Sequence, residues 1–87
     1  MASAWINRGI AEVNLDKTHD AVRSLEQSLR MIPANPVALL WLSEAYKKQN
    51  RDSDAAMAIE KARKINPDVV EMFMKEQEAT MFLAPEE

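Results

Sequence analysis

Apolar residues recur along the chain every three or four positions, the spacing that gathers them on one side of an α-helix. A clear stripe is Ala21, Leu25 and Ile32, with charged and amide side chains opposite. The same spacing returns between residues 55 and 65. The pattern predicts an all-α protein with helices at about 4–14, 20–32, 36–49, 53–65 and 69–83.

Polar residues mark where two of these helices begin. Asn35 followed by Pro36 predicts an N-cap and then a proline at the first helical position, where the missing N–H is harmless. Asp68, with Glu71 three residues later, has the spacing of a capping box and predicts a helix that opens at Val69.

Other punctuation repeats at a fixed distance. Pro33 and Pro67 are 34 residues apart, and so are Asp16 and Asn50 in the short polar turns between helices. Asp and Asn tolerate the left-handed backbone that ends a helix. A shared spacing of this kind indicates one structural unit used twice.

The positions between these marks repeat as well. In the second unit they are Leu39, Leu42, Ser43, Tyr46, Ala55, Ile59 and Pro67. In the first unit they are Trp5, Gly9, Ala21, Leu25 and Pro33. This series resembles the tetratricopeptide repeat family, whose helix–turn–helix unit has the pattern W-x2-L-G-x2-Y…A-x3-F…P.

The resemblance implies a helix–turn–helix solenoid of two repeats and a fifth, capping helix. The units are repeat one at about 2–35, repeat two at about 36–69 and the capping helix at about 69–83, in a single domain of residues 1–87. The first copy departs from the pattern at Arg8 and Glu12, where the consensus has Leu and Tyr. Because an unpaired buried charge is costly, we expect these two residues to pair or to stay wet.

Composition narrows the chemistry. There is no cysteine, so neither a thiol nucleophile nor a thiolate metal site can form. The single histidine, His19, lies in a turn with Asp16 and Asp20, which offer too few oxygen ligands for a hard cation. We therefore give His19 a structural or capping role, and we predict a non-enzyme without catalytic residues, metal or cofactor.

Charge and hydropathy argue against two classes of partner. The net charge is −3, and the basic groups are interrupted by acids, which disfavours nucleic-acid binding. No stretch approaches the roughly 18 apolar residues that cross a membrane. We expect a cytoplasmic protein whose partner is another protein or a peptide, with no nucleic acid and no membrane insertion.

The resemblance also implies where that partner binds, because the first helix of each unit lines an inner groove in this family. Carried onto this sequence, the groove residues are Ile6, Ile10, Val13, Asn14, Val37, Leu40, Trp41, Glu44, Lys48, Glu71, Met74, Lys75 and Glu78. Independently of the family, Ile6, Ile10 and Val13 form an apolar stripe of their own. A groove of this composition fits an amphipathic helix or an apolar peptide.

Other interpretations of this stripe stay open. Family members that grip a terminal carboxylate carry Lys and Asn where this chain has Ile6 and Ile10, so we expect no carboxylate clamp. The stripe can instead cover the chain's own core, or be covered by the segment "MFLAP" at residues 81–85.

The last predicted helix favours a rival hypothesis, self-assembly. About three repeats are usually needed to stack a continuous core, and this chain has two repeats and one further helix. That helix is apolar on two sides, and only one side finds a partner within the chain. The residues expected to join copies in a homodimer are Met72, Phe73, Met81, Phe82 and Leu83.

Overall fold

The computed structural model describes the backbone of residues 1–82 and the side chains of residues 1–78. Within this part of the chain there are helices and turns and no strand, which confirms the all-α prediction. The helices are α1 (Ala2–Asn14), α2 (Thr18–Met31), α3 (Pro36–Lys48), α4 (Asp52–Ile65) and α5 (Pro67–Phe82).

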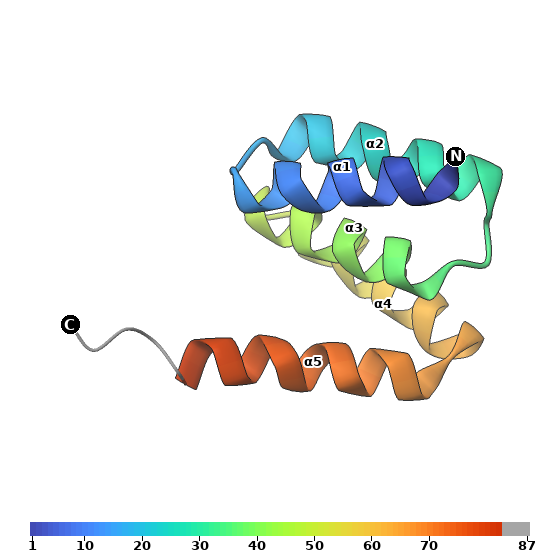
Figure 1. Ribbon diagram of the computed structural model, residues 1–87. Coiled ribbons are helices and arrows are strands. Elements are labelled where there is room, and N and C mark those ends of the chain that lie inside the picture. The colour runs from blue at the N-terminus through green and yellow to red at the C-terminus, as the bar shows by residue number, and fades with distance from the viewer. Residues whose placement is uncertain (83–87) are drawn as a thin grey trace.

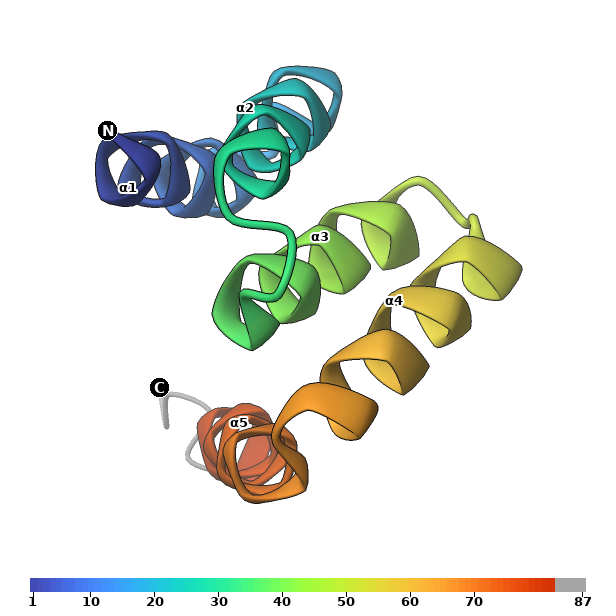
Figure 2. The same cartoon turned by 90° about the vertical axis from the view of Figure 1, so that its right-hand side faces the viewer.

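The helices form a two-layer solenoid. Figure 2 shows α1, α3 and α5 in one layer and α2 and α4 in the other. Successive helices run in opposite directions, and the layer of α1, α3 and α5 faces the viewer in Figure 1. This arrangement is the expected helix–turn–helix solenoid with a fifth helix at the end of the second repeat.

The predicted turns and the cap of α3 are confirmed. Asp16 and Asn50 have φ angles of 62° and 63°, the left-handed conformation that lets the chain turn sharply after α1 and after α3. The Asn35 side-chain oxygen accepts hydrogen bonds from the N–H groups of Val37 at 3.0 Å and Ala38 at 3.3 Å. These two bonds satisfy N–H groups that have no partner inside the helix.

The predicted start of α5 is wrong by two residues. The helix begins at Pro67, because the Asn66 side-chain oxygen accepts a hydrogen bond of 3.2 Å from the Val69 N–H. Asn66 followed by Pro67 therefore repeats the arrangement that opens α3. Asp68 lies inside the first turn, where a carboxylate complements the helix dipole.

The core has two parts. Val13, Leu25 and Leu42 are buried where α1, α2 and α3 meet. A second cluster joins α3 to α4 and α5 through Leu39, Leu40, Ala58, Ala62, Val70 and Phe73. Leu29 and Trp41 pack against both clusters, so these two partly buried side chains connect the repeats.

Close approach of α1 and α2 depends on Gly9. A Cβ atom built on Gly9 would lie 2.6 Å from the Cγ atom of Leu25, closer than real Cβ atoms come to other heavy atoms. Leu25 is fully buried and cannot move aside freely. The glycine therefore allows the first helix pair to pack.

Candidate functional site

The layer formed by α1, α3 and α5 carries the predicted groove, and its accessible apolar residues come from all three helices. Val37 is 39% exposed, whereas Ile6, Ile10, Trp41 and Met74 are half-buried. Because none of these side chains is fully withdrawn from solvent, the surface remains available to a partner.

Two residues predicted for the groove belong to the core instead. Val13 is 2% exposed and Leu40 is fully buried, each within one of the two core clusters. The helical spacing groups Val13 with Ile6 and Ile10, but residues of α2 and α3 pack around Val13 and bury it. Neither Val13 nor Leu40 can contact a partner directly.

Two of the polar residues of the predicted groove, Lys48 and Glu44, are held in ion pairs. Lys48 Nζ is 2.7 Å from Asp16 Oδ1, which ties the end of α3 to the turn between α1 and α2. Glu44 Oε2 is 3.4 Å from Lys47 Nζ. The remaining members are exposed to solvent: Asn14 on α1, and Glu71, Lys75 and Glu78 on α5.

The assignment of Phe73 to a self-association surface is wrong. Phe73 is 9% exposed, and its ring lies edge-on to Trp41 with centroids 5.3 Å apart. Phe73 therefore anchors α5 to α3. Met72, the next residue along, is 63% exposed and remains a candidate for contact between copies. The side chains of Met81 and Phe82, and the whole of Leu83, lie outside the described residues.

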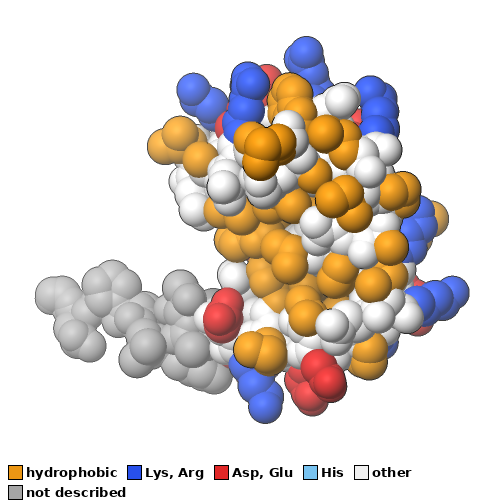
Figure 3. Space-filling view, turned by 45° about the vertical axis from the view of Figure 1, so that its right-hand side comes forward, with side chains coloured by type: hydrophobic (Ala, Val, Ile, Leu, Met, Phe, Trp, Pro, Cys, Tyr) orange, Lys and Arg blue, Asp and Glu red, His pale blue; other side chains and the backbone are white. Residues whose placement is uncertain are grey.

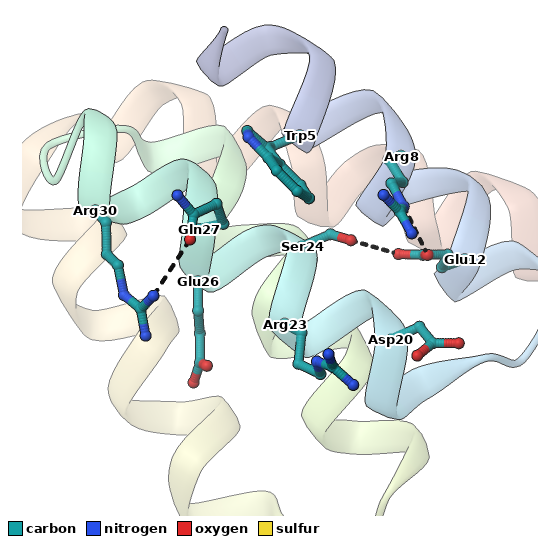
Figure 4. Close-up of a pocket in the computed structure, with 9 residues that line it drawn as sticks. All are labelled: Trp5, Arg8, Glu12, Asp20, Arg23, Ser24, Glu26, Gln27 and Arg30. Carbon is teal, nitrogen blue, oxygen red and sulfur yellow. Dashed lines mark hydrogen bonds and ion pairs between the residues drawn. The ribbon is translucent and has the colours of Figure 1, made fainter.

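Arg8 and Glu12 pair, which is one of the two arrangements expected from the sequence. Arg8 Nε lies 3.2 Å from Glu12 Oε2, and the buried Ser24 hydroxyl donates a hydrogen bond of 2.7 Å to Glu12 Oε1. Figure 4 shows the resulting chain of contacts from α1 to α2. Sequence reasoning missed Ser24, although a serine at a position of the apolar stripe was the available signal.

These contacts lie in a cleft of about 430 Å³ on the outer side of α1 and α2. The cleft residues that repeat 34 positions later are Trp5, Arg8, Glu12, Asp20, Arg23, Ser24 and Gln27. Their counterparts line a second cleft and are Leu39, Leu42, Tyr46, Asp54, Met57, Ala58 and Lys61. In the second cleft α2 supplies further wall residues, Glu26 and Leu29. The first cleft therefore occupies the position in repeat one that the second cleft occupies in repeat two, but its lining is more polar.

His19 lies in the first turn of α2 and not in the connecting turn expected from the sequence, and it takes part in a link to the end of α3. Its Nδ1 atom lies 3.3 Å from the Gln49 side-chain nitrogen, which also donates to the Thr18 hydroxyl at 3.2 Å. Over residues 1–78, no three His, Cys, Asp or Glu side chains gather as they would around a metal ion. No helix in the described part of the chain has the length and hydropathy to cross a membrane.

Fold and surface together define a helical-repeat protein with an accessible apolar face. A family model described as tetratricopeptide repeat matches residues 15–75, well over half of the chain. The chain belongs to the tetratricopeptide repeat family. It is similar to sperm-associated antigen 1 of mouse and of rat, with 34% identity over 67 residues in each case. These residues make up 77% of this chain but only 7% and 8% of the two relatives.

The family match begins after α1. Among the helix positions of the first repeat, Arg8 and Glu12 are the two that replace the consensus Leu and Tyr. The structure nevertheless packs α1 against α2 through Gly9 and Leu25. Helix α1 therefore completes the first repeat despite its altered outer face.

Proposed function

We propose that the layer of α1, α3 and α5 binds an amphipathic helix or an apolar peptide of another protein. Tetratricopeptide repeats are generally protein–protein interaction modules. The observation that carries the finer proposal is the set of accessible apolar side chains on this layer, above all Val37, Ile10 and Trp41. A helix with one apolar side could bury them without leaving its own polar groups unpaired.

The charges of this layer argue against recognition through a carboxylate. Lys48 is held by Asp16, and Glu44 lies beside Lys47. On α5, Lys75 stands among Glu71 and other acids. Since the described residues place no unopposed cluster of positive charge in the groove, apolar burial is the main source of affinity in this proposal, with charges setting orientation.

Selection from a phage library of random 16-residue peptides, with the full chain as bait, tests this proposal. Peptides that bind should bury apolar residues against Ile10 and Val37. We expect their affinity to fall at least roughly tenfold in Ile10→Glu and Val37→Glu. Met57→Glu is the matched control, because Met57 is 59% exposed on α4, in the other layer.

The binding site can be followed directly by fluorescence. Trp5 and Trp41 are the two tryptophans, and Trp5→Phe leaves Trp41 as the single reporter. Peptide binding to the proposed surface should shift Trp41 emission to shorter wavelength. Selected peptides that bind Val37→Glu as tightly as the parent, or that leave Trp41 emission unchanged, would contradict the proposal.

Self-association through α5 is a second candidate, and the exposure of Met72 favours it. Burying such a side chain between copies would contribute about 1.5–3 kcal/mol. Light scattering across a hundred-fold dilution should then show a mass that rises with concentration, and Met72→Glu should abolish the rise. A constant monomer mass for the parent chain would exclude this candidate.

A further inference from the structure

A separate groove lies at the end of the molecule where the connection between α2 and α3 passes the last turn of α4. It has a volume of about 480 Å³. Leu29 and Leu39 form its floor, and Pro33, Ala34 and Ile65 form its walls. Pockets that bind ligands in proteins are typically about 300–1,000 Å³, so this groove can receive a few side chains of a partner.

The surroundings of this end groove are unusually apolar for an exposed surface. Ile65 is 41% exposed, and the neighbouring Met31 and Ile32 are each 48% exposed. Figure 3, in which this end is turned toward the viewer, shows hydrophobic side chains gathered across it and Lys or Arg side chains at its margin. Contiguous exposed apolar surface with a polar rim is typical of an interaction site.

Two lysines, Lys61 and Lys64, stand beside the apolar floor. Neither lysine has an ion-pair partner within the described residues, and no acidic side chain lines the end groove there. Both ammonium groups therefore remain available to carboxylates from outside. The groove pairs an apolar floor with positive charge on one wall.

We propose that the end groove binds a short extended segment of another protein, in which an apolar side chain is followed closely by acidic residues. The apolar side chain would pack on Leu29 and Leu39, and the carboxylates would approach Lys61 and Lys64. Of the layer of α1, α3 and α5 this site includes only Leu39, and it does not depend on the function proposed for that layer.

Charge and chain length argue against two other occupants. A second copy placed with the same face opposed would bring Lys61 and Lys64 close to their own counterparts, which is repulsive. The chain's own residues 83–87 span at most about 18 Å when extended. Helix α5, which starts beside Ile65 and precedes these residues in the chain, is about 24 Å long, since each of its 16 residues adds about 1.5 Å.

The same peptide selection tests this proposal, because different substitutions weaken binding at each of the two sites. We expect a second class of selected peptides, rich in Asp or Glu next to one apolar residue. Their affinity should fall about tenfold in Lys64→Glu and be lost when Ala34→Trp fills the end groove. Arg63→Glu is the matched control, since Arg63 is an exposed neighbour of the same charge that does not line the groove.

The outcomes are distinguishable. Acidic–apolar peptides whose affinity is unchanged in Val37→Glu but falls in Lys64→Glu would support binding in the end groove. This holds whether or not peptides of the first class are found. Selection without any acidic class, or equal loss in Lys64→Glu and Arg63→Glu, would overturn it. Two further results together would show that a second copy of the chain, and not another protein, occupies the groove. A peptide of residues 81–87 would compete with the selected peptides, and the chain would form concentration-dependent dimers that are lost when residues 83–87 are deleted.

Discussion

The Ser24 hydroxyl donates a hydrogen bond of 2.7 Å to the Glu12 carboxylate, and 34 residues later the same two positions hold Ala58 and Tyr46. In the second repeat these two positions are apolar and aromatic, and α2 adds Glu26 and Leu29 to the wall beside them. In the first repeat the bond stabilises a polar outer face that needs no covering helix. A face of this polarity tolerates exposure to water, as the polar capping faces of repeat arrays do.

Replacing Arg8 and Glu12 with the consensus Leu and Tyr should therefore cause copies of the chain to associate through this face. The double variant Arg8→Leu/Glu12→Tyr removes the ion pair and exposes a leucine and a tyrosine beside Trp5. We expect concentration-dependent self-association, measured by light scattering at several protein concentrations. Glu12→Gln keeps the face polar and should leave the mass unchanged relative to the parent; equal masses for both variants would contradict this account.

Gly9→Ala tests the close approach of α1 and α2. Alanine would gain about 1 kcal/mol of helix propensity, but its Cβ would overlap with Leu25, and overpacking costs about 1–3 kcal/mol. We expect net destabilisation of about 1 kcal/mol in urea unfolding. Asn7→Ala, at an exposed position of the same helix, should be neutral or slightly stabilising. A Gly9→Ala chain that is more stable than the parent would show that the helices separate easily.

The repeat pattern predicts the helices well because each is specified by local sequence. Asn35 caps α3, and Asp16 and Asn50 take the left-handed turn conformation, for reasons contained in a few neighbouring residues. The start of α5 was harder to predict, since Asn66 and Asp68 are both good capping residues and only one can take the place. Asn66 takes it, with proline at the following position.

The groove was predicted less well because burial depends on neighbouring helices. Leu40 and Val37 share one helix, yet Leu40 is fully buried by α4 and α5 whereas Val37 is 39% exposed. Periodicity within α3 cannot say how far α5 reaches over it. Likewise the end groove joins residues from α2, α3 and α4, and no single stretch of sequence contains it.

Phe73→Ala should release α5 from the repeats. Among the described residues of α5, Phe73 and Val70 are the buried side chains that hold the helix, and truncating a buried phenylalanine costs about 3–5 kcal/mol. In the Trp5→Phe background, Trp41 would lose its edge-on ring and its emission should move to longer wavelength. Lys75→Ala, at an exposed position of the same helix, is the control and should change neither stability nor emission.

Tyr46 should make stability depend on alkaline pH. Burial, with the nearby Glu26 carboxylate, raises the pKa of the Tyr46 hydroxyl above its ordinary value, although Arg51 opposes the rise. The folded state therefore holds this proton more tightly than the unfolded state. Its contribution is complete below pH 10 or so and declines as pH rises through the folded pKa. Tyr46→Phe should reduce the alkaline loss of stability in urea unfolding between about pH 8 and 11; an identical loss in both chains would contradict this.

Ser28→Ala should stabilise the protein, whereas Ser24→Ala should destabilise it. Both serines are buried on α2, one turn apart, but the Ser28 hydroxyl has no hydrogen-bond partner among the described residues and the Ser24 hydroxyl donates to Glu12. An unpaired buried hydroxyl costs about 1 kcal/mol or more, and the position 34 residues later already holds the fully buried Ala62.

Because removing the Ser28 oxygen relieves that cost, we expect a gain of about 1 kcal/mol and a melting temperature higher by about 4–8 °C. Ser24→Ala removes a hydrogen bond to a charged group and leaves one oxygen of the 12%-exposed Glu12 side chain without its donor, so its melting temperature should fall by a similar amount. Thermal unfolding followed by circular dichroism compares the two directly. Shifts of the same sign would mean that helix propensity, which favours alanine at both sites, outweighs the hydrogen bond between α1 and α2.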